Sequence, residues 1–79
     1  MKETPISKIM SPAEKFSYQL QHIRTSLKVS QSELADRAGI TQTVISKIEA
    51  GSANPTLATI ERIAAALNME LSITLRLKR

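Results

Sequence analysis

Two different spacings of apolar residues divide the chain into a long first part and a short last part. Between residues 11 and 68, apolar residues recur every three or four positions, which is typical of helices that bury one face. From Met69 to Leu77 they alternate instead with polar residues, which is typical of a half-buried β-strand. We therefore expect an all-α domain that is followed by one C-terminal strand.

Helix-capping sequences divide residues 11–68 into four helices. Ser11 is followed by Glu14, and Ser30 by Glu33, at the spacing of a capping box, in which each side chain accepts a hydrogen bond from the other residue's backbone. The predicted helices are Pro12–Ser26, Gln31–Ala38, Gln42–Ala50 and one from Leu57 to about Leu67, with Thr41 and Thr56 as N-caps of the last two and with Gly39, Gly51 and Asn68 ending the last three.

The first predicted helix carries one apolar stripe, and the residues before it carry none. Phe16, Leu20, Ile23 and Leu27 recur at helical spacing, so we expect all four to be buried. Residues 1–10 show no period, and we interpret them as a flexible N-terminal tail. The predicted organisation is a tail at 1–10, a helical domain at 11–68, and a strand with a basic end at 69–79.

Residues 31–50, QSELADRAGITQTVISKIEA, predict two short helices that meet at a tight turn. Ala35 is small enough for the next helix to cross closely, and Gly39 can adopt the left-handed backbone of the turn. Four aliphatic side chains are spaced to face inward and to fix the angle between the helices: Leu34, Ile40, Ile45 and Ile48. A generic helical hairpin is the alternative interpretation of this pattern.

This pattern resembles the helix-turn-helix of phage repressors and Xre-type regulators. The resemblance extends to the SQSELA sequence at the start of the segment and to IEAGSANPT at its end. In those proteins the second helix of the pair enters the major groove of DNA. The resemblance implies a four-helix, phage-repressor-like domain that binds DNA in a sequence-specific manner.

The outward side chains of the predicted third helix are short and polar, with few charges. Such side chains can form hydrogen bonds with base edges, and methyl groups can contact thymine, whereas carboxylates would be repelled by phosphates. Gln42 is the first candidate, because its amide can bind N6 and N7 of adenine together. The predicted base-contacting residues are Gln42, Thr43, Val44, Ser46 and Lys47, each of which could also be an ordinary solvated side chain.

Phosphate contacts are expected at helix N-termini, where free N–H groups and the helix dipole favour an anion. Ser30 and Gln31 begin one such helix, and Thr41 begins the other. The resemblance to phage repressors implies a phosphate contact at Gln31 in particular. Asn54, in the loop before the fourth helix, is a further candidate.

The resemblance also implies a structural ion pair. In phage repressors an arginine on the first helix pairs with a glutamate near the end of the recognition helix, and Arg24 and Glu49 stand at the matching positions. We interpret them as a pair that fixes the position of the third helix. A catalytic role for Glu49 is disfavoured, because no second acid or nucleophile accompanies it.

The composition excludes most enzymatic chemistry. The chain has no cysteine and one histidine, so thiolate catalysis and cysteine-ligated zinc are excluded. It has no acid pair, nucleophile set, metal-ligand cluster or phosphate-binding loop, and we expect no enzymatic activity, no metal and no cofactor. The net charge of +4 is compatible with a nucleic-acid partner. No apolar run approaches the roughly 20 residues of a transmembrane helix, so we expect a cytoplasmic location and no membrane partner.

A single strand cannot satisfy its own backbone hydrogen-bonding groups, so the predicted strand requires a partner. The simplest partner is the same strand of a second copy, antiparallel across a two-fold axis. The alternative is donation of the strand to a different protein. In the homodimer, five side chains would cover the helical cores: Met69, Leu71, Ile73, Leu75 and Leu77. A two-fold dimer would also match a palindromic DNA operator.

Three segments give a closer resemblance, to the HipB antitoxins: KIMSPAEKF, SQSELADRAGITQTVIS and LNMELSITL. HipB antitoxins are Xre-type proteins with four helices and a C-terminal strand that pairs in the dimer. The resemblance implies a dimer that binds operator palindromes, represses its own toxin–antitoxin operon and neutralises a HipA-like Ser/Thr kinase toxin. The NPTLATIERIAAAL segment is also similar to HigA-type antitoxins, whose toxins are RelE-like ribonucleases, and a stand-alone Xre-type repressor is a third possibility.

Overall fold

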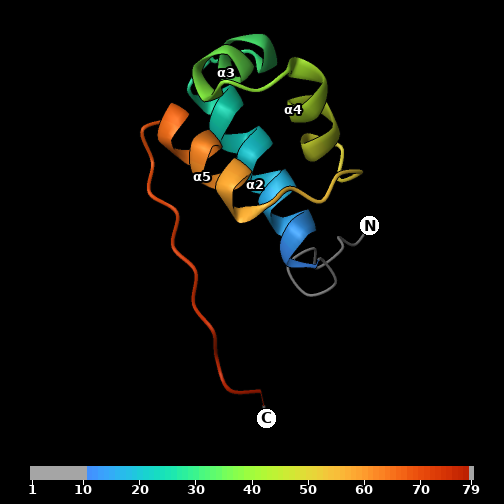
Figure 1. Cartoon of the computed structure of the whole chain (residues 1–79), viewed down its shortest axis with the longest axis vertical. Coiled ribbons are helices and arrows are strands. Elements are labelled where there is room, and N and C mark those ends of the chain that lie inside the picture. The colour runs from blue at the N-terminus through green and yellow to red at the C-terminus, as the bar shows by residue number, and fades with distance from the viewer. Residues whose placement is uncertain (1–10, 79) are drawn as a thin grey trace, which may run out of the picture.

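The helical domain forms as the sequence predicts. The computed structural model describes residues 11–78. In these residues the chain forms α2 (Pro12–Ser26), α3 (Gln31–Ala38), α4 (Gln42–Glu49) and α5 (Leu57–Ala66), which pack together as shown in Figure 1. The helix α4 ends one residue earlier than expected. The tail predicted at residues 1–10 lies outside the described residues.

Side-chain caps begin each of these helices. Ser11 Oγ accepts from Glu14 N at 3.1 Å, and Glu14 Oε1 accepts from Ser11 N at 2.8 Å, which completes the first capping box. Ser30 and Glu33 form the second box at 3.0 and 2.9 Å. The N-caps of α4 and α5 are threonines, whose hydroxyls each accept a backbone N–H at 3.2 Å. These bonds satisfy donors that have no partner inside the helix.

The turn between α3 and α4 depends on a left-handed residue. Gly39 has φ 71° and ψ 33°, and the next residue, Ile40, donates its N–H to Ala35 O at 3.0 Å. A side chain at this position would meet no atom within 4 Å, so backbone conformation and not crowding requires glycine. The turn directs the chain from α3 into α4 within three residues.

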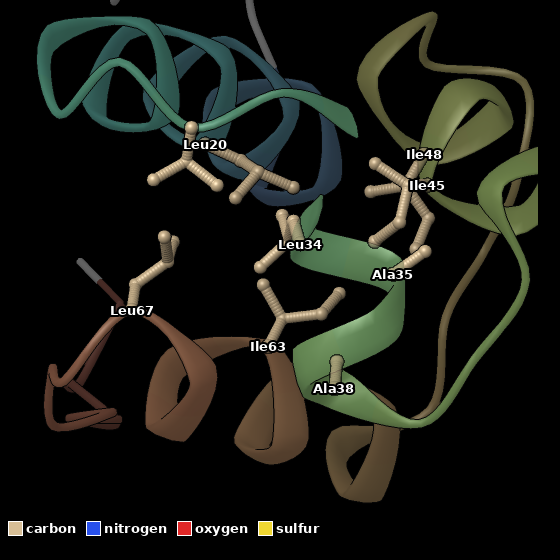
Figure 2. Packing of buried hydrophobic residues seen from close by; sticks show 9 residues of the cluster. Leu20, Leu34, Ala35, Ala38, Ile45, Ile48, Ile63 and Leu67 are labelled. Carbon is tan, nitrogen blue, oxygen red and sulfur yellow. The ribbon is translucent and has the colours of Figure 1, made fainter. Parts of the chain in front are cut away.

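The core lies between the four helices of the described residues. Leu34 of α3 is fully buried and lies between Leu20 of α2 and Ile63 of α5 (Figure 2). Ile45 and Ile48 of α4 are also fully buried and point toward α3. Burial of each such side chain contributes about 1.5–3 kcal/mol. Two faces of α3 are therefore covered, one by α4 and one by α5 and α2.

The apolar stripe predicted on α2 is wrong at its last position. Leu27 is 52% exposed and lies at the C-cap, where the helix has ended. The following residue, Lys28, has φ 60°, which turns the chain so that Val29 enters the core in its place. Val29 N donates to Arg24 O at 3.1 Å and closes this turn. Helical spacing does not indicate such a turn.

The C-terminal segment leaves the helices after Asn68, whose φ is 62°, and runs along one side of the domain and beyond it (Figure 1). Residues 69–78 form no strand in the structure, and no other residue between 11 and 78 is in a strand. The predicted strand and its pairing therefore stay a prediction. Leu75 and Leu77 are 95% and 92% exposed. Within residues 11–78, no helix is long and apolar enough to cross a membrane.

Candidate nucleic-acid interface

The helix α4 has one buried face and one exposed face. Ile45 and Ile48 anchor it to the core, and the positions between and before them face outward. All five predicted base-contacting residues are exposed, and so is the N-cap: Thr41, Gln42, Thr43, Val44, Ser46 and Lys47. The side chain of Val44, the one hydrophobic residue among them, is 38% exposed. The helix thus presents a row of side chains that no other element of the described domain covers.

The exposed face of α4 carries hydrogen-bonding groups and no carboxylate. An amide, hydroxyls, a valine and one ammonium group are the chemistry that base edges and thymine methyl groups require. The one acidic residue of α4 is Glu49, and its side chain is only 3% exposed because it points toward α2. The face is therefore free of the negative charge that would repel DNA phosphates.

Arg24 of α2 and Glu49 of α4 form a buried two-point ion pair. Arg24 Nε donates to Glu49 Oε2 at 2.6 Å, and Arg24 Nη2 donates to Glu49 Oε1 at 2.9 Å. Arg24 Nη1 also donates to the carbonyl of Val29 at 2.8 Å, in the turn that precedes α3. Among the described residues, no buried side-chain polar atom lacks a hydrogen-bond partner. The guanidinium therefore joins α2, the following turn and the last residue of α4.

Gln31, the first residue of α3, joins this cluster as well. Its Nε2 donates to Glu49 Oε1 at 2.9 Å, a contact that sequence reasoning did not identify. The only sequence signal is a polar side chain at the start of α3, which also fits the predicted phosphate contact. An amide nitrogen has two hydrogens, so one bond to Glu49 leaves the second for another acceptor. The structure thus brings Arg24, Gln31 and Glu49 together from three helices.

The pKa values describe the same cluster. Burial raises the pKa of Glu49, but the hydrogen bonds from Arg24 and Gln31 and the arginine charge together outweigh burial and leave the pKa below its ordinary value. The hydrogen bond to Glu49 likewise raises the pKa of Arg24 against the effect of burial. A carboxyl whose pKa falls on folding stabilises the protein above its unfolded pKa, roughly 4.3, and this contribution is lost as the pH falls through the folded value. The pair is therefore charged at neutral pH.

The other predicted phosphate-contacting residues lie at helix starts or in a loop. Ser30 and Thr41 are exposed N-caps of α3 and α4, and Asn54 is exposed in the loop before α5. At the start of α3, Glu33 places a carboxylate, whose pKa is lowered mainly by the hydrogen bond from the Ser30 backbone. The Glu33 carboxylate therefore places negative charge at this helix start, which would repel an anion close to it. The start of α4 has no acidic side chain.

Comparison with known proteins gives a family match over most of the domain. Residues 20–73 match the helix-turn-helix family HTH_3. The uncharacterized HTH-type transcriptional regulator y4dL of Sinorhizobium fredii is 41% identical over 58 residues, which are 73% of this chain and 30% of that protein. An uncharacterized HTH-type transcriptional regulator of Haemophilus influenzae is 41% identical over 56 residues, 70% of this chain and 57% of that protein. The chain thus spans about a third to just over half the length of these relatives.

Several solved structures whose sequences are related to this chain have the same fold. The restriction-modification controller protein C.AhdI of Aeromonas hydrophila has a TM-score of 0.71 and 33% identity, covering 73% of this chain and 88% of that one. HipB in an O1–O2 complex has a TM-score of 0.71 and 32% identity, covering 84% and 94%. A HipA–HipB–O2–O3 complex contains a chain with a TM-score of 0.72 and 28% identity, covering 82% and 92%. The four-helix architecture predicted from the sequence is confirmed.

Removing one member of the buried pair should cost more stability than removing both. We expect Arg24→Met to lower the free energy of unfolding by about 3–5 kcal/mol at pH 7, because the Glu49 carboxylate then stays buried without a counter-charge. The double variant Arg24→Met/Glu49→Met should recover most of this loss. Urea unfolding followed by circular dichroism measures both.

The exposed Arg62 of α5 offers a matched control, and Arg62→Met should change stability by less than about 0.5 kcal/mol. The difference in unfolding free energy between the wild type and Arg24→Met should shrink below pH 4. Protonation of Glu49 weakens the ion pair in the wild type and removes the unpaired buried charge in Arg24→Met. An Arg24→Met loss equal to that of Arg62→Met would contradict a structural role for the pair.

Proposed function

The chain belongs to the HTH_3 helix-turn-helix family, and on this premise we propose that it is a sequence-specific DNA-binding repressor that acts as a dimer. In this proposal α4 is the recognition helix, which lies in the major groove. The observation that carries the proposal is the exposed face of α4. It combines hydrogen-bonding tips with the absence of a carboxylate, while the helix itself is fixed to the core by two isoleucines and a buried ion pair.

Gln42 is assigned the main contact with a base. It is the first residue of α4 and is exposed, so its amide extends from the end of the helix that enters the groove. We assign Thr43 and Val44 to thymine methyl groups, and Ser46 and Lys47 to base edges or the backbone.

Phosphates are proposed to bind at the starts of α3 and α4. The second hydrogen of the Gln31 amide and the N–H groups of the first turn of α3 are the donors on one side. The first turn of α4, capped by Thr41, is the donor on the other, and Asn54 is a further contact. Because Gln31 also holds Glu49, a phosphate bound there would be linked through one residue to the end of the recognition helix.

A two-fold dimer would place two copies of α4 on one face of a DNA duplex. Half-sites one helical turn apart, roughly 34–36 Å, are the usual spacing for such dimers. We assign dimerisation to the segment 69–77, paired with the same segment of a second copy as an antiparallel strand. The exposure of Leu75 and Leu77 supports this assignment, because a second strand would cover them.

We propose further that the repressor is a HipB-like antitoxin. Support comes from the similarity to HipB chains over more than four-fifths of this sequence, and from HipB occurring with HipA in one of the similar structures. The protein partner would then be a HipA-like Ser/Thr kinase toxin. The similarity to a restriction-modification controller protein favours the alternative of a regulator without a toxin, and a HigA-type antitoxin with a RelE-like ribonuclease is the remaining alternative.

Replacing the proposed base-contacting amide should weaken specific binding alone. We expect Gln42→Ala to reduce binding to the DNA upstream of the protein's own gene by about 1–3 kcal/mol, with little change for an unrelated duplex. Fluorescence anisotropy at fixed salt measures both affinities. Gln21→Ala, which removes an exposed amide from α2, is the matched control and should leave both unchanged. Unchanged specific binding by Gln42→Ala would remove the assigned role.

Replacing the cation of α4 should act on salt dependence as well. If Lys47 neutralises a phosphate, Lys47→Ala weakens binding to all duplexes and lowers the slope of log K against log salt by about 0.9 for each protomer. Anisotropy titrations between roughly 50 and 200 mM salt give the slope, because binding to DNA changes strongly with salt over this range. An unaltered slope would show that Lys47 contacts a base or nothing.

A further inference from the structure

The C-terminal segment leaves apolar side chains uncovered beside apolar grooves. Met69 and Leu71 line a groove of about 340 Å³ together with Phe16, Leu20, Ile23 and Leu67. Leu71 and Ile73 continue into a second groove of about 490 Å³, which the exposed Leu57 also lines. Beyond this point Leu75 and Leu77 contact almost nothing. The segment therefore has an apolar face that begins on the domain and ends in solvent.

We infer that two copies of this segment pair in one particular register, in which Ile73 faces Ile73 of the second copy. The inference rests on the proposed dimer and specifies the interaction that selects its partner. In a two-fold antiparallel pair, opposite residues point to the same face of the ribbon. Apolar residues of one copy therefore face apolar residues of the other only if the two-fold axis passes beside a residue, so that this residue faces the same residue of the second copy. The residues near the centre of the segment are Ser72, Ile73 and Thr74.

The Ile73 register pairs every apolar side chain of the segment with another apolar side chain. Leu71 then faces Leu75 of the second copy, and Met69 faces Leu77. A register centred on Thr74 would place Met69 opposite the basic end of the chain. A register centred on Ser72 would leave Leu77 opposite the end of α5, where no strand can pair. The apolar pattern alone thus favours Ile73.

The charges on the polar face disfavour the Ser72 register and agree with the Ile73 register. Glu70 is the only carboxylate between residues 69 and 79, and in this register it faces Arg76 of the second copy, twice in each dimer. Opposite charges at facing positions of an antiparallel pair stabilise it, and like charges destabilise it. In the Ser72 register Glu70 would face Thr74, and in the Thr74 register it would face Lys78. The charges therefore disfavour the Ser72 register, and the apolar pairs decide between the other two. The segment is therefore complementary in charge to itself, which favours a second copy over an unrelated strand.

The second copy would also cover the exposed leucines. Because Leu75 and Leu77 of one copy lie opposite Leu71 and Met69 of the other, they reach the groove that these two residues line with α2 and α5. Both copies gain the same contacts because the interface is two-fold. The two most exposed leucines of the described chain thus acquire an apolar environment in the dimer.

Disulfide trapping tests the register directly, because the chain has no cysteine of its own. Single variants Ser72→Cys, Ile73→Cys and Thr74→Cys each place one thiol near the proposed axis, and only self-facing thiols come close enough to bond. Under mild oxidation we expect Ile73→Cys to form disulfide-linked dimers roughly tenfold faster than the other two. Faster trapping of Ser72→Cys or Thr74→Cys, or equal rates for all three, would overturn the register.

A charge exchange provides a second test that leaves the apolar face intact. Glu70→Arg and Arg76→Glu should each weaken self-association several-fold to tenfold, since each creates two pairs of like charges. Mixed in equal amounts, the two variants should form mainly mixed dimers in native mass spectrometry, because both cross-strand pairs become attractive. As a control, Glu70→Arg mixed with Lys78→Glu should show a weaker preference. The reverse preference would indicate the Thr74 register and overturn the inference.

The outcomes separate this inference from the proposed function. A wild type that is dimeric in sedimentation and binds an inverted repeat, without the expected trapping or mixing, refutes the register while the repressor function stands. A wild type that is monomeric at the concentrations at which it binds DNA refutes both the register and the proposed dimer.

Discussion

A buried charged cluster determines where the proposed recognition helix lies. Arg24, on α2, binds Glu49 at the last residue of α4 through two hydrogen bonds of 2.6 and 2.9 Å, and Gln31 adds a third bond from α3. Such a cluster contributes little net stability over an apolar equivalent, because both charges lose their water, but it is strongly destabilised when one partner is absent. Its effect is therefore on position: the end of α4 has one place in which the carboxylate is satisfied.

The exposed face of α4 depends on this arrangement. Ile45 and Ile48 attach the helix to the core, but apolar packing alone tolerates small rotations and shifts. The ion pair adds directional bonds at the C-terminal end, and the Gly39 turn fixes the N-terminal end. The same pair removes the only carboxylate of α4 from its outer surface. One interaction thus contributes both to the position of the helix and to the chemistry of its exposed face.

The helices were predictable because local rules determine them. Capping boxes at Ser11 and Ser30 and the left-handed Gly39 are properties of a few neighbouring residues, and the structure forms each of them. The predicted burial of Leu27 was wrong. Lys28 adopts a left-handed backbone that redirects the chain, and no glycine or asparagine in the sequence signals this turn.

Contacts between distant residues were less accessible from the sequence. Periodicity cannot pair Arg24 with Glu49, which are 25 positions apart, and only the resemblance to phage repressors suggested it. The bond from Gln31 to Glu49 was not foreseen, because an amide at a helix start fits several roles. The apolar alternation predicts a strand at 69–77, but a strand there would need a partner strand that the described residues do not supply, so the strand stays a prediction.

The central claim is that the exposed face of α4 recognises a base sequence twice, in a two-fold dimer. Selection of the purified protein on a library of randomised duplexes, followed by sequencing of the bound fraction, tests this claim most directly. The account predicts enrichment of an inverted repeat whose half-sites are about one helical turn apart, roughly 10 base pairs. Bound and unbound fractions of the same sequence composition, or an enriched single half-site without a repeat, would contradict it.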